Sequence, residues 1–114
     1  MWNPISLNEL SEIISFTESD IEDHLKTFWE LIRIEPEKWK EKDYGEEGGG
    51  FWVVAICGKK VVWYNDIEEG FNISIYHTYG EIQDYFCYQY ELNHVVWQLY
   101  NIDANFRSSG PPDQ

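Results

Sequence analysis

The chain has 114 residues, of which 43% are hydrophobic and 18% aromatic, and this is enough to build one domain around a buried core. Its formal net charge of −13 is spread over both halves, because residues 1–47 carry 13 acidic and 5 basic residues and residues 48–114 carry 8 and 3. Such a field argues against binding nucleic acid or anionic membranes and favours a basic partner, although surface acids also simply raise solubility.

The composition predicts one domain over residues 1–107 and a frayed tail over residues 108–114. Within it, the N-terminal third predicts two helices. Ser6 and Glu9 form a capping box, and Thr17 with Asp20 forms a looser one that begins the second helix. Pro36 disfavours helical geometry at the residue before it, so this helix is expected to end near residue 34, with a further helical turn over residues 36–40. The apolar positions at helical spacing, expected to face a sheet, are Leu7, Leu10, Ile13, Ile14, Ile21, Leu25, Phe28, Trp29 and Ile32.

Residues 51–87 predict four consecutive strands. Residues 51–57 are apolar throughout, as in a strand buried on both faces, and Gly58-Lys59 forms a two-residue turn to the next strand at residues 61–64. The third strand, over residues 71–76, alternates apolar and polar side chains, so one of its faces should be wetter, and the fourth covers residues 82–87. The turn sets the predicted pairs Ile56–Val61, Val54–Trp63 and Val53–Tyr64.

Apolar residues recur at helical spacing from Tyr88 to Leu99 and predict a final helix of about three turns. The expected fold class is therefore α+β, with N-terminal helices, a four-stranded antiparallel meander sheet and a C-terminal helix. Whether helices cover one face of that sheet or both stays open.

The two cysteines, Cys57 and Cys87, lie in apolar, strand-like surroundings. The chain starts without a signal-peptide pattern and contains no apolar run of about 18 residues, so we expect a cytoplasmic protein that does not enter membranes. In a reducing compartment both thiols are expected to be buried as small hydrophobic groups, with a Cys57–Cys87 disulfide as the alternative.

The sequence offers no recognisable catalytic or metal-binding motif. It lacks a phosphate-binding glycine loop, an HExxH and a CxxC motif, so we expect no enzyme activity, no catalytic residues, no cofactor and no metal. Two weaker alternatives are a metal site built from His77, His94 and Cys87, and a thiol nucleophile formed by Cys87 with His94 and an acid.

The stretch WYNDIEEGFNIS, residues 63–74, places three acids on a loop between two strands. Its spacing does not fit a calcium loop, since Gly70 follows Asp66 too early and no acid comes in register afterwards. Acids that attract a basic protein beside aromatic groups that anchor it would suit an interface, whereas the plain alternative is a solvated loop. The predicted partner-binding residues are Asp66, Glu68, Glu69, Tyr64 and Tyr76, with the three acids at an exposed tip.

The segments WVVA, CGKKVVWYNDIEEGFNIS and GEIQDYFCYQYEL, within residues 51–92, resemble small acidic single-domain bacterial proteins of the immunity type. Such proteins bind and neutralise a toxin delivered by competing cells. The resemblance implies a cytoplasmic, non-enzymatic inhibitor whose partner is often a basic nuclease-type toxin. It implies no contact residues, because the binding surfaces of such proteins diverge.

The expected function is thus that of an acidic protein-binding module, of the immunity type, for a basic protein partner. Two alternatives remain: a small ligand-binding or enzymatic domain with a pocket between sheet and helices, and a homo-oligomer that hides its aromatic residues in a self-interface. The sequence leaves the oligomeric state open.

Overall fold

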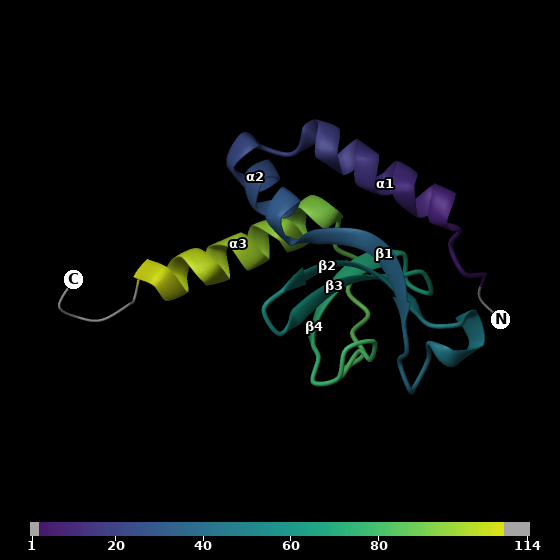
Figure 1. Cartoon of the computed structure of the whole chain (residues 1–114). Helices are drawn as coiled ribbons and strands as arrows, with labels where there is room; N and C mark the ends of the chain where they lie inside the picture. Colours follow the sequence, from purple (N-terminus) through teal and green to yellow (C-terminus); the bar gives the residue numbers. More distant parts are fainter. Residues whose placement is uncertain (1–2, 109–114) are drawn as a thin grey trace.

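The protein folds into a helical layer on a four-stranded sheet (Figure 1). The computed structural model describes residues 3–108, apart from the side chains of residue 47 and residues 103–108. The fold is α+β with helices at both ends, as predicted. The elements are α1 (Leu7–Asp20), α2 (Asp23–Ile32), β1 (Arg33–Trp39), the short 3₁₀ turn η1 (Glu46–Gly48), β2 (Phe51–Cys57), β3 (Lys60–Asn65), β4 (Gly70–Ile75) and α3 (Leu92–Ser108).

The sheet is an antiparallel meander in the order β1-β2-β3-β4, but one of its strands is not the predicted one. Residues 33–40 were expected to end a helix and add a helical turn, but Arg33–Trp39 form β1 instead. Its side chains alternate between exposed and half-buried positions, and Pro36 is tolerated because β1 is an edge strand whose register with β2 shifts between Arg33 and Glu37. The alternation is hard to see in the sequence because charged residues and a proline occupy most of it.

The predicted strand at residues 82–87 does not form. The chain from residue 76 to residue 91 instead crosses the sheet face opposite the helices (Figure 1). Three buried polar side chains hold it there: Asn65 donates to the carbonyl of Phe86, Ser74 donates to that of Asp84, and Asn72 pairs with the backbone of Tyr88. The polar face of β4 is therefore buried rather than wet, and its polar groups replace a strand ladder.

The β2–β3 hairpin has the predicted two-residue turn, and its register near the turn is correct, with Ile56 opposite Val61. Farther from the turn the prediction is wrong by one residue, because Val53, not Val54, pairs with Trp63. The cause is a bulge between Val53 and Ala55, which turns Val54 and Ala55 to the same face of the sheet.

The capping box of Ser6 and Glu9 starts α1 as predicted, with hydrogen bonds of 3.1 Å in both directions. The second box is wrong, because Thr17 lies inside α1, which continues to Asp20. The chain breaks at Ile21, and α2 begins at Asp23 without a side-chain cap. The apolar stripe assigned to this second helix is nevertheless correct, since all five of its members are buried: Ile21, Leu25, Phe28, Trp29 and Ile32.

Two hydrophobic cores lie on opposite faces of the sheet. The first joins the helices to one face, and its largest fully buried side chain is Trp29. The second lies under the 76–91 segment around Trp39 and Trp63, with Ile82 from that segment as a further member. Helices therefore cover only one face, and an irregular segment covers the other.

Several smaller expectations can be settled. Cys57 is half-buried but Cys87 is exposed, so the prediction that both are buried is wrong for Cys87, and among the described residues the two are not joined in a disulfide. The final helix starts later and runs longer than predicted, to Ser108, and residues 109–114 of the predicted tail lie outside the described range. Within residues 3–108, no helix is both long and apolar enough to cross a bilayer.

Candidate functional site

The five predicted partner-binding residues do not share one surface. Tyr64 is only 8% exposed and belongs to the core beneath the helices. Tyr76 lies against the other core, with its ring 5.2 Å from that of Trp39 and nearly perpendicular to it. The two tyrosines therefore lie on opposite sides of the sheet, and the face of the third strand that was expected to be wetter is covered.

Tyr64 and Glu69 do meet at a groove on the helical side of the molecule. This groove has a volume of about 620 Å³ and lies between α1, the end of β3, the start of β4 and the start of α3. Its apolar lining comes from all of these parts of the chain, and we call it the acid-rimmed groove for its charges. The apolar lining residues are Ile5, Ile13, Phe16, Tyr64, Phe71, Tyr90 and Leu92.

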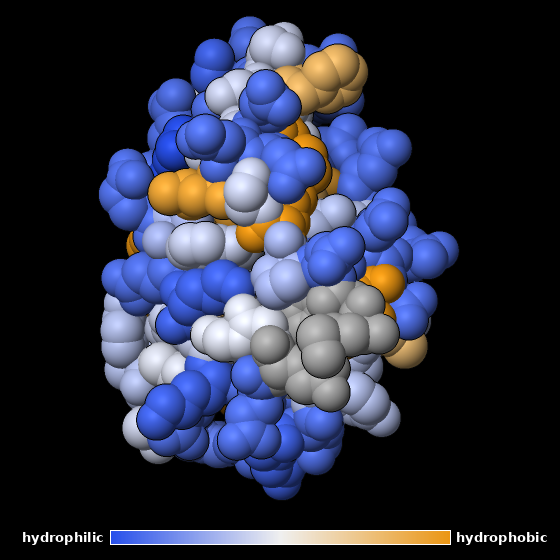
Figure 2. Space-filling view, turned by 90° about the vertical axis from the view of Figure 1, so that its right-hand side faces the viewer, coloured by the Kyte–Doolittle hydropathy of each residue, from blue (hydrophilic) through white to orange (hydrophobic). Residues whose placement is uncertain are grey.

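Four glutamates line the same groove: Glu9 and Glu12 from α1, Glu69 from the β3–β4 loop, and Glu91 from the residue before α3. None of the described residues that line it is basic. Acids from three separate segments therefore converge around apolar surface. The α1 side of the groove exposes apolar surface to solvent, since Phe16 is 74% exposed. In Figure 2 apolar surface gathers among hydrophilic residues in the upper half of the view, where α1 lies.

The electrostatics of the groove appear in the titration of Tyr64. Burial raises the pKa of its phenol, and the negative charges of Glu69, Asp66 and Glu9 raise it further. Because Glu9 comes from α1 and the other two from the β3–β4 loop, both sides of the groove contribute negative potential at this ring. A positive charge placed there would be stabilised by the same potential.

Asp66 is not part of an exposed acidic tip, contrary to the prediction. It is half-buried, and its Oδ2 accepts a 2.7 Å hydrogen bond from the backbone N–H of Ile5, while its Oδ1 is buried with no partner among the described residues. Burial raises the pKa of this carboxyl, although the hydrogen bond from Ile5 and the charge of Lys38 oppose that effect. Asp66 therefore fastens the segment before α1 to the β3–β4 loop and positions one side of the groove.

The rest of the loop is also anchored. Glu68 is half-buried, its backbone N–H donates to Asn65 Oδ1, and its carbonyl accepts from the side chain of Gln89. Glu69 alone among the three acids is exposed, and it adopts a positive φ of 60°. Gly70 follows in β4, where a Cβ would come within 2.3 Å of the Gln89 backbone, so glycine is needed here for close approach and not for a left-handed turn.

Sequence reasoning missed the α1 side of the groove. Ile13 was assigned to the apolar face of the first helix and Glu9 to its capping box, but Glu9, Glu12 and Phe16 were not assigned to a binding surface. A signal was present, because Glu9, Glu12, Ile13 and Phe16 occupy positions i, i+3, i+4 and i+7 and so share one side of a helix. That side is displaced from the buried pair Leu10 and Ile14, which indicates a second, outward-facing surface.

The alternative chemistries find little support in the arrangement. Within the described residues no three His, Cys, Asp or Glu side chains are placed to hold a metal ion. His77 and Cys87 are exposed, and neither lines the acid-rimmed groove. His94 lines a different hollow, of about 520 Å³, between the start of α2 and the start of α3.

Comparison with known proteins adds no relative to this picture. Neither the models of known protein families, nor the curated proteins, nor the solved structures include a match to this chain. The functional argument therefore rests on the acid-rimmed groove and its surroundings.

Proposed function

We propose that this chain is a non-enzymatic, acidic protein-binding domain whose partner is a basic protein. The observation that carries the proposal is the acid-rimmed groove, in which four glutamates from three segments border an apolar floor. The resemblance to small acidic immunity proteins adds a biological role, namely that the partner is a toxin that this chain neutralises in the cytoplasm.

Apolar and charged groups contribute differently to such a site. Burying Ile13, Phe16 and Tyr90 against a partner supplies affinity, because well-packed apolar and aromatic contacts at the centre of an interface carry most of the binding energy. The glutamates on the rim remain partly solvated, so they act mainly on the rate of association and on the choice of partner. With a net charge of −13, the whole molecule adds a long-range attraction to any basic surface.

The matching surface on the partner can be described. It has an apolar ridge that fits between α1 and residues 89–92, flanked on both sides by lysine or arginine. An amphipathic helix or a loop with this pattern would fit, since grooves beside helices commonly accept such segments. A nucleic acid would bring phosphates against the glutamates, which argues against it.

A second candidate function follows from the size of the groove. A volume of about 620 Å³ lies within the range of small-molecule sites, roughly 300–1,000 Å³. A small ligand there would be cationic and largely apolar. Such a ligand would compete with a basic protein for the same groove. Binding of a folded protein partner would therefore distinguish the first candidate function from the second.

The test uses the protein encoded by the reading frame next to this one, because toxin and immunity genes commonly lie together. Its association with this chain is followed by stopped flow at rising NaCl concentration. We expect a stable one-to-one complex whose association rate falls by about tenfold or more between low and high salt, as for steered encounters. A complex that forms at a salt-independent rate, or no complex at all, would contradict the proposal.

A matched pair of variants tests whether the partner binds at the acid-rimmed groove. Glu12→Lys and Glu30→Lys make the same charge change at exposed helical positions, but only Glu12 lines the groove. We expect Glu12→Lys to slow association and to speed dissociation more than Glu30→Lys does. Equal effects of the two variants would mean that the partner senses the overall charge and binds elsewhere.

A further inference from the structure

Five exposed or half-buried rings form a continuous row beside the groove. They come from the end of the 76–91 segment and the first turns of α3, and we call them the aromatic row: Phe86, Tyr88, Tyr90, His94 and Trp97. Successive ring centroids lie 6.2, 5.0, 4.7 and 5.9 Å apart, and successive planes are inclined by 24°, 18°, 38° and 25°. Three of the four contacts are stacked, and the Tyr90–His94 contact is tilted.

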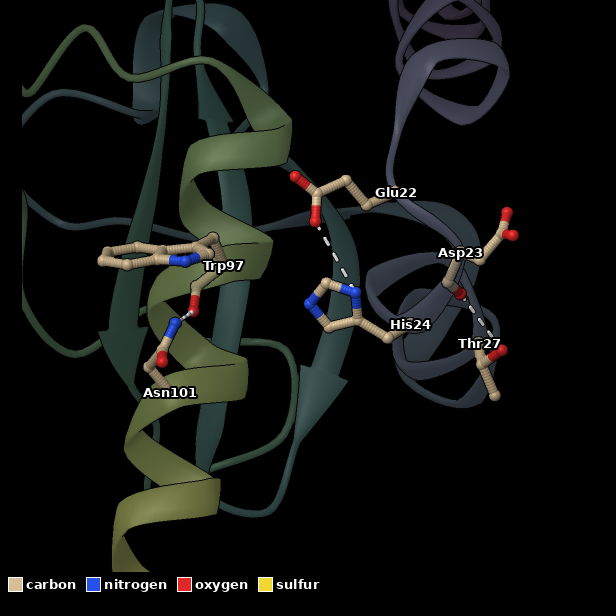
Figure 3. A network of polar contacts seen from close by, with 6 residues as sticks. All are labelled: Glu22, Asp23, His24, Thr27, Trp97 and Asn101. Atoms are coloured by element: carbon tan, nitrogen blue, oxygen red, sulfur yellow. Dashed lines mark hydrogen bonds and ion pairs between the residues drawn. The ribbon is translucent and has the colours of Figure 1, made fainter.

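Only Tyr90 of the row packs against a core, the one beneath the helices. Tyr88 is 55% exposed and Trp97 is 50% exposed, whereas the buried stripe of α3 consists of Leu92, Val95, Val96 and Leu99. In Figure 3 the Trp97 ring projects from α3 on the side away from α2. Stacked aromatic faces of this extent are costly to leave in water, and they mark a surface made for contact.

The fold holds these rings in place before any partner arrives. Asn72 binds both backbone polar groups of Tyr88, with two hydrogen bonds of 3.0 Å, and Asn65 binds the carbonyl of Phe86 at 2.9 Å. Tyr90 pairs with Phe71 of β4 in an isolated antiparallel bridge. With the backbone fixed at three successive alternate residues, the ring spacing is preorganised, which lowers the entropic cost of binding.

Carboxylates border the row at its α3 end. Asp20, Glu22 and Glu91 line the hollow of about 520 Å³ that His94 and Trp97 also line. Glu22 reaches toward α3 from the α2 side, where its carboxylate lies 3.6 Å from His24 Nδ1, so within the described residues Asp20 and Glu91 are the acids of this hollow without such a contact (Figure 3). The surface therefore offers aromatic faces and negative charges together, and this combination selects a planar cation.

We propose that the aromatic row binds arginine side chains of the basic partner, with guanidinium groups on the ring surfaces that the neighbouring rings leave exposed, foremost those of Tyr88 and Trp97, and paired with the neighbouring carboxylates. This inference rests on the proposed function and names the partner chemistry. Arginine is favoured over lysine because its guanidinium is planar, weakly hydrated and able to stack on an aromatic face while it donates to a carboxylate. The groove and the row share Tyr90 and Glu91, so one partner surface can occupy both.

The chain contains an internal example of the same contact. The guanidinium of Arg33 lies 5.8 Å from the ring centroid of Trp29 and pairs with the carboxylate of Glu18, which also accepts a hydrogen bond from the Trp29 indole. An arginine, an aromatic face and a carboxylate thus form a stable triad within this fold. The aromatic row and its neighbouring carboxylates supply the aromatic face and the carboxylate, and a partner would supply the arginine.

Other occupants fit the charges less well. Nucleic-acid bases stack on such rows, but their phosphates would meet Asp20, Glu22 and Glu91. A second copy of this chain would bring another net charge of −13 to the same surface. A carbohydrate could lie on the rings but would gain nothing from the carboxylates.

The experiment uses two synthetic peptides of equal length and charge, in which six arginines or six lysines alternate with glycine. Their affinity for the full chain is measured by calorimetry at near-physiological salt. We expect the arginine peptide to bind more tightly than the lysine peptide. Trp97→Ala and Tyr88→Ala should each weaken the arginine peptide by about two- to fivefold, as expected for one exposed cation–π contact, and should reduce the preference for arginine.

Leu31→Ala is the matched control, because Leu31 is 80% exposed on α2 and lies in neither the row nor the hollow. Equal affinity for the two peptides, unchanged by the row variants, would overturn this inference and leave the proposed function intact, since basic chains would still bind by charge. Binding of neither peptide would overturn it as well, and the stopped-flow experiment would then decide the proposed function separately. If the chain bound a neutral oligosaccharide and Trp97→Ala abolished this binding, the row would be a carbohydrate site. If it formed a dimer in ultracentrifugation and Trp97→Ala abolished the dimer, the row would be a self-interface.

Discussion

The two faces of the sheet are covered in different ways. On one face, α1, α2 and α3 pack apolar side chains onto the strands around Trp29. On the other, the 76–91 segment has almost no regular structure and is held by the buried side chains of Asn65, Asn72 and Ser74. The helical cover is stabilised by area removed from water, and the irregular cover depends in addition on a few specific hydrogen bonds.

This difference determines where binding surfaces arise. Helices leave grooves where their ends diverge from the sheet, and the acid-rimmed groove is of this kind. The 76–91 segment is anchored through its backbone at Phe86, Tyr88 and Tyr90, and it thereby presents these three side chains in a row. The two candidate surfaces meet at Tyr90, where the irregular cover leads into α3.

The largest effect is expected on the helical face. Leu99 on α3 is 1% exposed and belongs to the core beneath the helices. Leu99→Ala should lower the free energy of unfolding by about 2–5 kcal/mol through lost burial and a residual cavity. Urea denaturation measures this loss. Limited proteolysis of the folded variant should show no preferential cleavage in residues 76–91, and preferential cleavage there would contradict the view that the two covers are held independently.

A smaller and more local effect is expected on the other face. Asn72→Ala removes both hydrogen bonds to the Tyr88 backbone, so the partly buried N–H and carbonyl of Tyr88 lose these partners. The free energy of unfolding should fall by about 1–3 kcal/mol. Hydrogen exchange should become faster in residues 84–90 while the amides of α2 keep their protection. If exchange rose equally in both regions, Asn72 would be stabilising the whole domain and not this segment in particular.

The same contrast explains how far the sequence could predict the fold. The helical stripe Leu25–Phe28–Ile32 and the hairpin turn at Gly58-Lys59 were read correctly, because local periodicity and turn chemistry specify them. Residues 82–87 were read as a strand because their aromatic composition suits a strand. That they cross a sheet face depends on hydrogen bonds to Asn72 and Ser74, which are distant in sequence and leave no periodic signal.

The candidate site was predictable to a similar extent. Tyr64 and Glu69 were singled out from their loop and do line the groove. Asp66 belongs to the same acidic run, yet it turns inward to Ile5, and composition cannot distinguish an acid that accepts a buried hydrogen bond from one that faces water. Glu9, Glu12, Phe16 and Glu91 join the groove because α1 lies beside the start of β4 and the start of α3. Only the tertiary structure shows this arrangement.

The smallest effect concerns Asp66, which joins the segment before α1 to the β3–β4 loop. The pKa of its carboxyl is raised in the folded state, chiefly by burial, from a model-compound value of 3.8. Its contribution to stability is therefore fully present below the pKa of the unfolded chain and is lost as the pH rises through the folded pKa. The ionised carboxylate, with Oδ1 buried and unpartnered among the described residues, destabilises the fold at neutral pH.

Asp66→Asn keeps an oxygen acceptor for the Ile5 N–H and removes the titration. We expect the free energy of unfolding of this variant to fall less steeply than that of the wild type as the pH rises from about 4 toward 7, and to equal or exceed the wild-type value at pH 7. Glu69→Gln makes the same charge change at an exposed position of the same loop and controls for net charge. Urea titrations at each pH provide the measurement. If both variants changed the pH dependence of stability equally, its source would be general repulsion among the many acids and not the burial of Asp66. The contact between the β3–β4 loop and the segment before α1 would then not depend on the protonation of Asp66.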